Sequence, residues 1–306
     1  MSQPPKKTFD VAIIGGGPAG LSAAITLGRA CRRVVVFDHG RPRNQAARHI
    51  HCFLGHDGIA PADLRARGRV EAERYGAVFI EAEVLKAACI SDEPGKAFRV
   101  HTEDREIESR IVLLTTGVVD ELPEIDGLRE LYGQSVHHCP YCDGWEHRGR
   151  RLVALGQTRS AVELAVSLRG WSEQVTLCSH GADVSAKDER FLQRHGIAVR
   201  TEPLSRLVGS DGALQCIEFA EGADLACDAV FFSSGQGQRS SLPAMLGCDC
   251  DDEGLIVTGK KNCTSVEGVY LAGDADGDSQ FAITAAAEGA TAATAIDREL
   301  KQQDFV

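Results

Sequence analysis

Two cysteines separated by two residues, Cys139 and Cys142, form the most reactive pattern in the sequence. Such a pair can close into a small disulfide ring and reopen, because the two sulfur atoms lie within bonding reach. Asp143 follows directly, and its carboxylate could carry the proton that dithiol chemistry gains or loses. We therefore predict that these three residues are catalytic. His137 or His138, just before the pair, could stabilise a thiolate.

The same two cysteines could instead be half of a structural zinc site. A site of that kind needs a second Cys-x-x-Cys or a pair of histidines at matched spacing. The only other close pair in the sequence, Cys248 and Cys250, has the wrong spacing, and the histidines before Cys139 are too close to it. The pattern favours redox chemistry, and no metal is expected.

The elements that would position a redox cofactor begin near the N-terminus. Residues 9–14 form an apolar run typical of a buried strand, residues 21–31 have helical spacing, and residues 33–38 form a second apolar run. This order predicts a β-α-β unit, the building block of nucleotide-binding α/β folds.

A G-x-G-x-x-G pattern joins the first of these strands to the helix. Gly15 permits a tight turn, Gly17 lets the backbone approach a pyrophosphate, and Gly20 lets the helix pack closely on the strand. Asp38 ends the second strand, where an acid can bind ribose hydroxyls. Together they predict a dinucleotide site, with the phosphates at the N-terminus of the helix.

Length and charge exclude several classes of function. A chain of 306 residues suggests two domains. Its net charge of 33 − 44 = −11, without basic blocks, argues against nucleic acid or an anionic membrane as the partner. No apolar stretch is long enough to span a bilayer, and residues 1–9 lack the apolar core of a signal peptide. We expect a cytoplasmic protein whose 11 cysteines are mostly buried thiols.

The order of predicted elements is repeated once along the chain. Each copy contains a β-α-β unit, a meander, and an apolar strand that ends in a small-residue turn. The first copy has its meander around a turn at residues 92–95 and its last strand at 111–114. The second copy has a β-α-β unit at 152–178, a meander at 203–230, and a last strand ending at residues 233–235. Two further strands at 255–258 and 269–274 and a helix at 280–300 follow, so an α/β fold class is predicted.

The glycine loop of the second copy is altered where a nucleotide would bind. Gly156 is retained, but Thr158 replaces the second glycine and Ala161 the third. The second strand ends at residues 178–180, Cys-Ser-His, without an acid for a ribose diol or an arginine pair for a 2′-phosphate. A working NADPH site and a retained fold with a weakened site both stay open, so NADPH is a doubtful cofactor.

Together these motifs resemble the low-molecular-weight thioredoxin reductase family, which are FAD-dependent pyridine nucleotide-disulfide oxidoreductases. The resemblance covers nearly the whole chain and rests on the first glycine loop and on residues 115–117, 139–144, 269–274, 280–282 and 287–289. It implies two Rossmann-like domains, doubly wound with three layers, the second inserted in the first. Residues 1–119 and 249–306 would form the FAD-binding domain, and residues 120–248 an NAD(P)H-type domain that carries the dithiol.

The resemblance also implies roles for individual residues. Cys142 would face the flavin, Cys139 would exchange with the sulfur of the substrate, and Asp143 would carry the proton. The partner would be a thioredoxin-like protein or a small dithiol or disulfide, and the protein a homodimer whose domains rotate. The predicted cofactor-binding residues are Gly15, Gly17, Pro18, Ala19, Gly20, Asp38, Arg43, Asn44, Val84, Thr116, Gly117, Gly273, Asp274, Gln280, Phe281 and Ala282.

Two segments differ from the reductases and resemble a side branch of the family. Residues 41–44 and 51–58 carry this resemblance. The branch includes many bacterial relatives and the dithiol oxidases of gliotoxin and holomycin biosynthesis, which close a disulfide in a small molecule and pass electrons through flavin to oxygen. Three hypotheses follow: a reductase with NADPH or another donor, an oxygen-dependent dithiol oxidase, and a non-catalytic flavin- or zinc-holding redox sensor. The roles of Cys52, Cys248 and Cys250 stay open.

Overall fold

The computed structural model describes residues 9–91, 97–233, 235–277 and 279–305. The chain divides into two compact units: unit 1 is Met1–Gln45, Cys52–Val119 and Gly237–Val306, and unit 2 is Ala46–His51 and Asp120–Gln236. Residues 237–248 thus group with unit 1, and the short segment 46–51 groups with unit 2. The polar segment 1–8, the turn expected at 92–95 and residue 234 of the second small-residue turn lie outside the described residues.

Unit 1 is built, within the described residues, on a seven-stranded sheet of order β3-β2-β1-β6-β5-β4, with β17 paired to the second half of β6. Its strands are β1 (Phe9–Ile14), β2 (Val34–Phe37), β3 (Val78–Ile80), β4 (Lys86–Cys89), β5 (Phe98–His101), β6 (Glu106–Leu114) and β17 (Val269–Leu271). Its helices are α1 (Pro18–Arg29), α2 (Pro61–Arg74), α7 (Leu242–Leu246) and α8 (Ala282–Asp304), with short 3-10 turns η1 (Arg43–Ala46), η2 (Lys260–Asn262) and η3 (Asp274–Asp276). Strands β4 and β5 form the antiparallel meander, and the others run parallel.

The core of unit 1 has two sides because successive side chains of a strand point to opposite faces. Val11 and Ile13 of β1 pack in the cluster that also holds buried residues of α1 and α8. Ala12 and Ile14 pack in a second cluster with Phe98 of the meander. The parallel strands are therefore apolar on both faces, as expected for a sheet that is covered on both sides.

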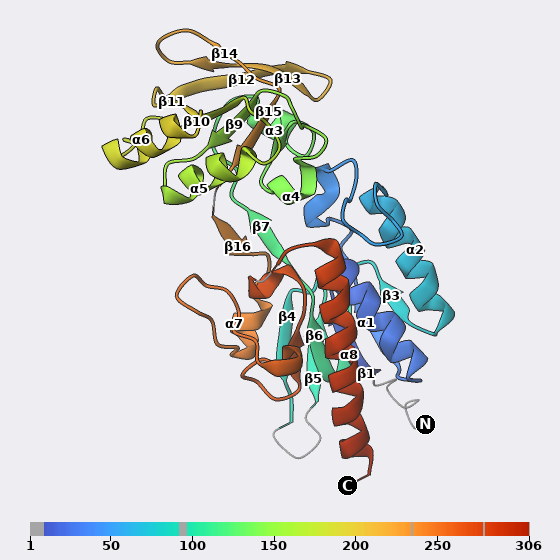
Figure 1. Cartoon of the computed structure of the whole chain (residues 1–306). Helices are drawn as coiled ribbons and strands as arrows, with labels where there is room; N and C mark the ends of the chain where they lie inside the picture. The colour runs from blue at the N-terminus through green and yellow to red at the C-terminus, as the bar shows by residue number, and fades with distance from the viewer. Residues whose placement is uncertain (1–8, 92–96, 234, 278, 306) are drawn as a thin grey trace. The chain divides into compact units, whose positions relative to one another are not determined.

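Helices α1 and α8 lie side by side on one face of this sheet (Figure 1). Their contact depends on a small residue in α8: a Cβ atom added to Gly289 would lie 2.0 Å from the carbonyl oxygen of Ala19 in α1. No side chain fits that space, so the two backbones can approach closely only with glycine at this position.

The variant Gly289→Ala is therefore expected to lower the free energy of unfolding by about 1–3 kcal/mol. Overpacking against a backbone oxygen should outweigh the gain of up to about 1 kcal/mol that alanine brings to a helix interior. Urea unfolding followed by circular dichroism measures the change. Thr291→Ala, on the exposed side of the same helix, is the control and should behave like wild type. A Gly289→Ala variant as stable as wild type would contradict the close contact.

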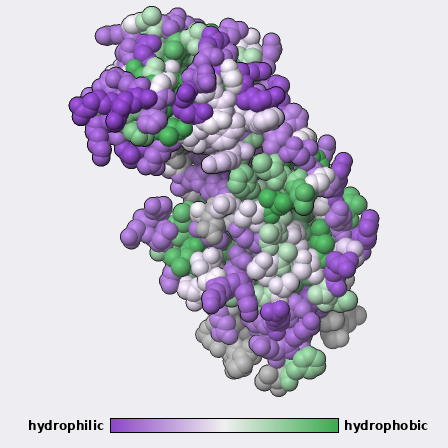
Figure 2. All heavy atoms as spheres, viewed as in Figure 1, coloured by the Kyte–Doolittle hydropathy of each residue, from purple (hydrophilic) through white to green (hydrophobic). Residues whose placement is uncertain are grey.

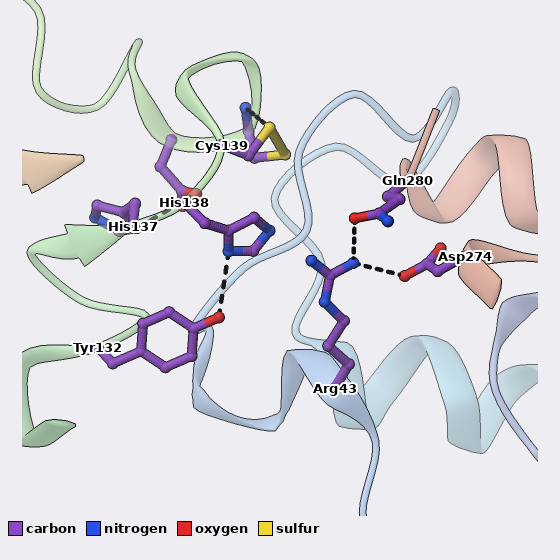
Figure 3. The surroundings of a disulfide bond; sticks show 9 residues. Arg43, Tyr132, His137, His138, Cys139, Asp274 and Gln280 are labelled. Atoms are coloured by element: carbon purple, nitrogen blue, oxygen red, sulfur yellow. Dashed lines mark hydrogen bonds and ion pairs between the residues drawn. A yellow bond between two sulfur atoms is a disulfide. The ribbon is translucent and has the colours of Figure 1, made fainter. Parts of the chain in front are cut away.

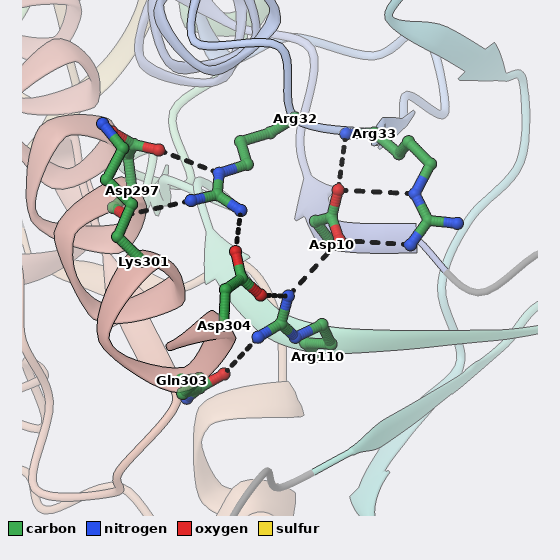
Figure 4. Close-up of polar contacts among 8 residues, drawn as sticks. All are labelled: Asp10, Arg32, Arg33, Arg110, Asp297, Lys301, Gln303 and Asp304. Atoms are coloured by element: carbon green, nitrogen blue, oxygen red, sulfur yellow. Dashed lines mark hydrogen bonds and ion pairs between the residues drawn. The ribbon is translucent and has the colours of Figure 1, made fainter. Parts of the chain in front are cut away.

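An ion-pair network ties the last turns of α8 to the beginning of the sheet (Figure 4). The guanidinium of Arg32 bonds Asp297 at 2.8 Å and Asp304 at 2.7 Å, and Arg110 bonds the other oxygen of Asp304 at 2.7 Å. Asp10, at the start of β1, pairs with Arg33 at 3.2 Å. Hydrogen bonds from Arg32 and Arg110 lower the pKa of Asp304. The network weakens as the pH falls through the lowered pKa values of its carboxylates.

Unit 2 repeats the same plan around a five-stranded sheet of order β11-β10-β9-β15-β8, counted within the described residues. Its strands are β8 (Val136–His137), β9 (Leu152–Leu155), β10 (Val175–Cys178), β11 (Ala198–Arg200) and β15 (Ala229–Phe232), and its separate meander is β12 (Leu204–Ser210), β13 (Ala213–Phe219) and β14 (Leu225–Ala226). Its helices are α3 (Leu128–Leu131), α4 (Pro140–Asp143), α5 (Arg159–Leu168) and α6 (Ala186–Arg194). The segments that cross between the units, β7 (Val118–Asp120) and β16 (Gln236–Gln238), pair with each other.

The sheet of unit 2 is also covered on both faces. One apolar cluster joins it to α5 and α6, and another joins it to the β12–β14 meander. Helix α6 buries only Leu192 fully, and Figure 2 shows a hydrophilic surface over it. Both units therefore have the Rossmann-like arrangement that the sequence predicts: parallel strands between two layers.

One predicted strand is wrong. Residues 255–258 form no strand, and Ile256 makes only an isolated bridge to Cys250. The backbone of this segment is satisfied locally, since Asp251 N–H donates to the Leu255 carbonyl at 2.9 Å and the Asp251 side chain accepts from Leu255 N–H at 2.9 Å. The apolar run therefore belongs to a tight turn stabilised by an aspartate.

Candidate active site

Cys139 and Cys142 form a disulfide in unit 2, with Cα atoms 5.3 Å apart. Cys139 caps the short helix α4, and Pro140 occupies its first turn, where a missing N–H costs nothing. One helical turn therefore brings the two sulfur atoms to the same side. The Cys142 N–H points at the Cys139 sulfur at 3.2 Å, which favours negative charge on that sulfur when the disulfide opens.

Asp143 ends α4 and contacts a buried pair of histidines. Its Oδ2 atom lies 3.3 Å from Nδ1 of His137, and Nε2 of His137 lies 3.0 Å from Nε2 of His147. His137 is on β8, and Phe231 of the neighbouring strand packs against both imidazoles. The sequence suggested His137 as a thiolate stabiliser, but both its ring nitrogens are engaged elsewhere. The role of His147 was missed, since no motif spacing marks it.

His147 is buried, with 7 % of its surface exposed. Burial lowers the pKa of His147 from 6.5 to about 4, and His137 and Arg150 add to this effect. Its imidazole is therefore neutral in the folded protein at neutral pH.

This buried histidine makes the fold sensitive to mild acid. Below pH 6.5 the unfolded chain protonates His147, whereas the folded chain does not until about pH 4, so stability falls as the pH drops through this window. We expect this residue to cost about 2 kcal/mol of stability between pH 7 and pH 5. Urea unfolding at both pH values should show a smaller loss for His147→Phe than for wild type. His56→Phe, at an exposed position, is the control and should lose as much stability as wild type. An equal loss of stability in all three proteins would contradict the lowered pKa of His147.

His138 belongs to a second, separate hydrogen-bond chain in unit 2 (Figure 3). The Tyr132 hydroxyl donates to Asp120 at 2.9 Å and lies 3.2 Å from Nδ1 of His138. Because the hydroxyl has only one proton, it accepts from His138, which therefore carries its proton on Nδ1. This holds the ring of His138 in one orientation beside Cys139.

The glycine loop between β1 and α1 has the predicted close contacts. Gly15 has a φ of +125°, and a Cβ atom there would lie 2.1 Å from the Thr115 carbonyl oxygen. A Cβ atom on Gly20 would lie 1.9 Å from the Gly15 carbonyl oxygen. Gly17 caps α1 with Pro18 next to it, and no side chain of the described residues bonds the first N–H groups of this helix. These groups are therefore available to an anion.

Two observations test whether this part of unit 1 fits a flavin nucleotide. A Cβ atom on Gly17 would meet nothing within 4 Å, so its surroundings are open to a ligand. The hydroxyl of Thr116, at the carboxyl end of β6, is buried and has no hydrogen-bond partner among the described residues. A buried hydroxyl normally makes a hydrogen bond, so a polar group of a bound ligand next to Thr116 would supply the missing partner. Both residues fit the predicted cofactor.

Three predicted cofactor residues from distant parts of the chain meet in unit 1. Nη1 of Arg43 bonds Asp274 at 2.8 Å and Gln280 at 2.7 Å (Figure 3). Gly273, just before, donates its N–H to Glu288 of α8 at 2.6 Å. Glu288 was not among the predicted site residues, although it lies in the segment 287–289 on which the resemblance rests.

The other predicted cofactor residues of unit 1 are placed as follows. Asp38 follows β2 and bonds Arg65 of α2 at 3.0 Å, a partner that the sequence did not suggest. Val84 is buried beyond β3, and Asn44 lies in η1. Ala19 is in the first turn of α1, Gly117 follows β6, and Phe281 and Ala282 begin α8. Their roles toward a cofactor stay predictions.

The altered glycine loop of unit 2 is closed by its own side chains. The hydroxyls of Thr158 and Ser160 lie 2.6 Å apart at the start of α5, and Ser233 donates to Ser160 at 2.8 Å. Arg159 is paired with Asp188 of α6 and with Glu163 at 3.4 Å. The side chains of Thr158, Arg159 and Ser160 therefore already have protein partners, although no cap side chain of the described residues bonds the first N–H groups of α5.

The remaining cysteines are free thiols among the described residues. Burial raises the pKa of Cys178 and of Cys227 to about 12, so neither forms a thiolate at neutral pH. Cys52 and Cys250 are exposed and Cys248 is buried. Within the described part of the chain, no group of three or more His, Cys, Asp or Glu side chains could hold a metal ion, and no helix has the length and hydropathy of a membrane span.

Comparisons with known proteins agree with this architecture. A model of the pyridine nucleotide-disulphide oxidoreductase family matches residues 9–289. A probable thioredoxin reductase of Arthroderma benhamiae is 31 % identical, with 98 % of this chain and 82 % of the relative covered. Thioredoxin reductase tcpT of Claviceps purpurea is 34 % identical, with 87 % and 86 % covered.

Solved structures give the same result for the fold. The crystal structure of HlmI superposes with a TM-score of 0.95 at 36 % identity, covering 100 % of this chain and 96 % of HlmI. A putative thioredoxin reductase TrxB from Bacillus anthracis superposes with a TM-score of 0.91 at 31 % identity, covering 97 % and 100 %.

Two Rossmann-like units and a Cys-x-x-Cys disulfide define the chain as a thioredoxin-reductase-like flavoprotein disulfide oxidoreductase. It belongs to the pyridine nucleotide-disulphide oxidoreductase family. Membership in this family implies a flavin as the cofactor.

Proposed function

We propose that the protein is an FAD-dependent dithiol–disulfide oxidoreductase that exchanges electrons with a protein or small-molecule substrate through Cys139 and Cys142. The observation that carries the proposal is the disulfide across α4, with Asp143 one residue further on. By analogy with the family, we also propose that the protein is a cytosolic homodimer. Its partner would be a thioredoxin-like protein or a small dithiol or disulfide.

The exchange itself is carried by three side chains. In the direction of dithiol oxidation, a substrate sulfur attacks the Cys139 sulfur, the bond to Cys142 breaks, and Cys142 leaves as a thiolate. Asp143 accepts the proton of the attacking thiol. The second substrate thiol then displaces Cys139, which leaves a substrate disulfide and a protein dithiol. Reduction of a disulfide substrate is the same sequence in reverse.

Unit 1 is proposed to hold FAD. The residues that would bind it are those of the Gly15–Gly20 loop, Asp38, Thr116 and the cluster of Arg43, Asp274 and Gln280. Bound FAD would supply the two-electron chemistry that links the dithiol to a nicotinamide or to oxygen. The loop would offer backbone N–H groups and space that no side chain fills, whereas the cluster would offer charged and hydrogen-bonding side chains.

A second candidate is an oxygen-dependent dithiol oxidase. It is favoured by the N-terminus of α5, where Thr158, Ser160 and Ser233 bond one another and Arg159 is paired with acids. A nicotinamide nucleotide would have to break these contacts to bind there. The reductase alternative needs NADPH or another donor to reach the flavin despite them.

An anaerobic titration of the flavin-loaded protein, followed in the visible spectrum, separates the candidates. Rapid bleaching by stoichiometric NADPH would establish a reductase and contradict the oxidase. Bleaching by a dithiol but not by NADPH or NADH, with recovery of colour in air, would establish the oxidase. A flavin that neither reagent bleaches would contradict the oxidase and leave either a reductase with another electron donor or a non-catalytic sensor.

A further inference from the structure

The feature that the exchange mechanism does not use is the buried pair of His137 and His147. The two residues are 4 % and 7 % exposed. Nδ1 of His137 lies 3.3 Å from Oδ2 of Asp143, and a hydrogen bond of 3.0 Å joins the two imidazoles behind it. Buried imidazoles are costly to place because their polar atoms need partners. A hydrogen-bonded pair directly behind the proposed proton carrier therefore suggests a function beyond packing.

The chemistry of the three groups fixes the direction of the bonds. A carboxylate can only accept, so Nδ1 of His137 is the atom that can donate across its 3.3 Å contact with Asp143. With that proton on Nδ1, the Nε2 atom of a neutral His137 ring carries a lone pair and can accept from Nε2–H of His147. This leaves Nδ1 of His147 as a lone pair, and that atom is buried without a hydrogen-bond partner among the described residues. An unbonded buried acceptor is easier to tolerate than an unbonded N–H, so the observation agrees with this direction.

Burial and the charges around His147 keep its imidazole neutral. Burial, His137 and Arg150 lower its pKa to about 4, while Asp143 and Asp228 act in the opposite direction. The ring therefore stays neutral at the pH values where thiols react.

We propose that His147, through His137, positions Asp143 as the proton acceptor of the dithiol. His147 holds the ring of His137, His137 contacts one oxygen of the carboxylate, and the other oxygen is left to take the proton of the attacking thiol. The inference rests on the proposed thiol–disulfide exchange and adds two positioning residues to it. Neither imidazole touches the sulfur atoms in this assignment.

Two substitutions of His147 separate hydrogen bonding from packing. His147→Phe keeps an aromatic ring against Phe231, whose centroid lies 6.2 Å away, but cannot donate. His147→Gln loses the ring but places an amide N–H near the position of Nε2. A positioning role predicts that glutamine rescues and phenylalanine does not, whereas a packing role predicts the reverse.

The measurement is the single-turnover reaction of the flavin-loaded, oxidised protein with dithiothreitol in the absence of oxygen. Acid quenching and thiol alkylation count the opened Cys139–Cys142 disulfide by mass, over pH 6–9 in buffer. We expect His147→Phe to react about 10- to 100-fold more slowly at pH 7, with an altered pH profile, and His147→Gln to stay within about threefold of wild type. Equal rates for wild type and His147→Phe, or equal losses in both variants, would overturn the inference.

A double mutant tests whether His147 acts through Asp143. In an Asp143→Asn background, His147→Phe should add less than about a twofold loss, because the group that it positions is gone. A further loss of tenfold or more would overturn the proposed route. If oxidised wild type fails to react with dithiols, the proposed function falls and this inference with it. A reactive wild type with an unimpaired His147→Phe variant removes only the inference.

Discussion

Cys139→Ser is expected to abolish thiol–disulfide exchange, and Cys142→Ser is expected to trap it halfway. Without the Cys139 sulfur there is no atom for the substrate to attack, so the rate should fall by several orders of magnitude, as when other enzymes lose their nucleophile. With Cys142 replaced, Cys139 can still attack a disulfide substrate. The resulting mixed disulfide then persists because no second protein thiol is at hand to resolve it.

Intact-mass spectrometry after mixing each variant with an oxidised small disulfide reads out both results. Cys142→Ser should gain the mass of one substrate half in near-stoichiometric yield, and Cys139→Ser should gain little. Cys89→Ser is a suitable control, since that exposed thiol lies in the meander of unit 1 and bonds the Ser91 carbonyl at 3.2 Å. If Cys139→Ser forms the mixed disulfide instead, the roles proposed for Cys139 and Cys142 are reversed. If both variants turn over substrate, the dithiol takes no part in the reaction.

Gly17→Ala should leave the apoprotein folded but weaken FAD binding by about 10- to 100-fold. The backbone of Gly17 has φ of −80° and ψ of −175°, which alanine adopts readily. A Cβ atom there meets no protein atom within 4 Å, so its cost arises only when a ligand is bound. FAD content after dialysis and the Tm of the apoprotein report the two effects separately.

Gly15→Ala is the contrasting variant at the same loop. Its Cβ atom would lie 2.1 Å from the Thr115 carbonyl oxygen, at a positive φ, so it should lower the Tm even without cofactor. If Gly17→Ala retains FAD as well as wild type, the pyrophosphate does not approach the loop at this glycine, and the proposed cofactor site is wrong.

The parts of the fold that could be predicted from the sequence are those specified by local chemistry. The loop from Gly15 to Gly20 is predictable because a side chain at either end would collide with a backbone oxygen nearby. The dithiol is predictable because one turn of helix brings Cys139 and Cys142 together wherever that helix lies. Both patterns depend on a few consecutive residues.

The parts that failed depend on contacts that no short pattern encodes. The apolar run at 255–258 looks like a strand, but hydrogen bonds with Asp251 turn it into a local loop. His147 reaches His137 only because β8 and the segment before β9 both pack against Phe231. Likewise, Arg65 meets Asp38 from a separate helix. In each case the deciding partner comes from outside the pattern.

The close contact of α8 with α1 has a consequence for how the chain is made. The core of unit 1 includes buried residues from β1 and α1 and also from α8, so it is incomplete until the ribosome has synthesised α8. The two cores of unit 2 come from residues 125–232, an unbroken stretch that emerges earlier. Unit 2 can therefore fold during translation while the strands that precede it still wait for their last helix. In that interval the apolar face of α1 is open to chaperones, and a premature stop codon before α8 would leave it uncovered.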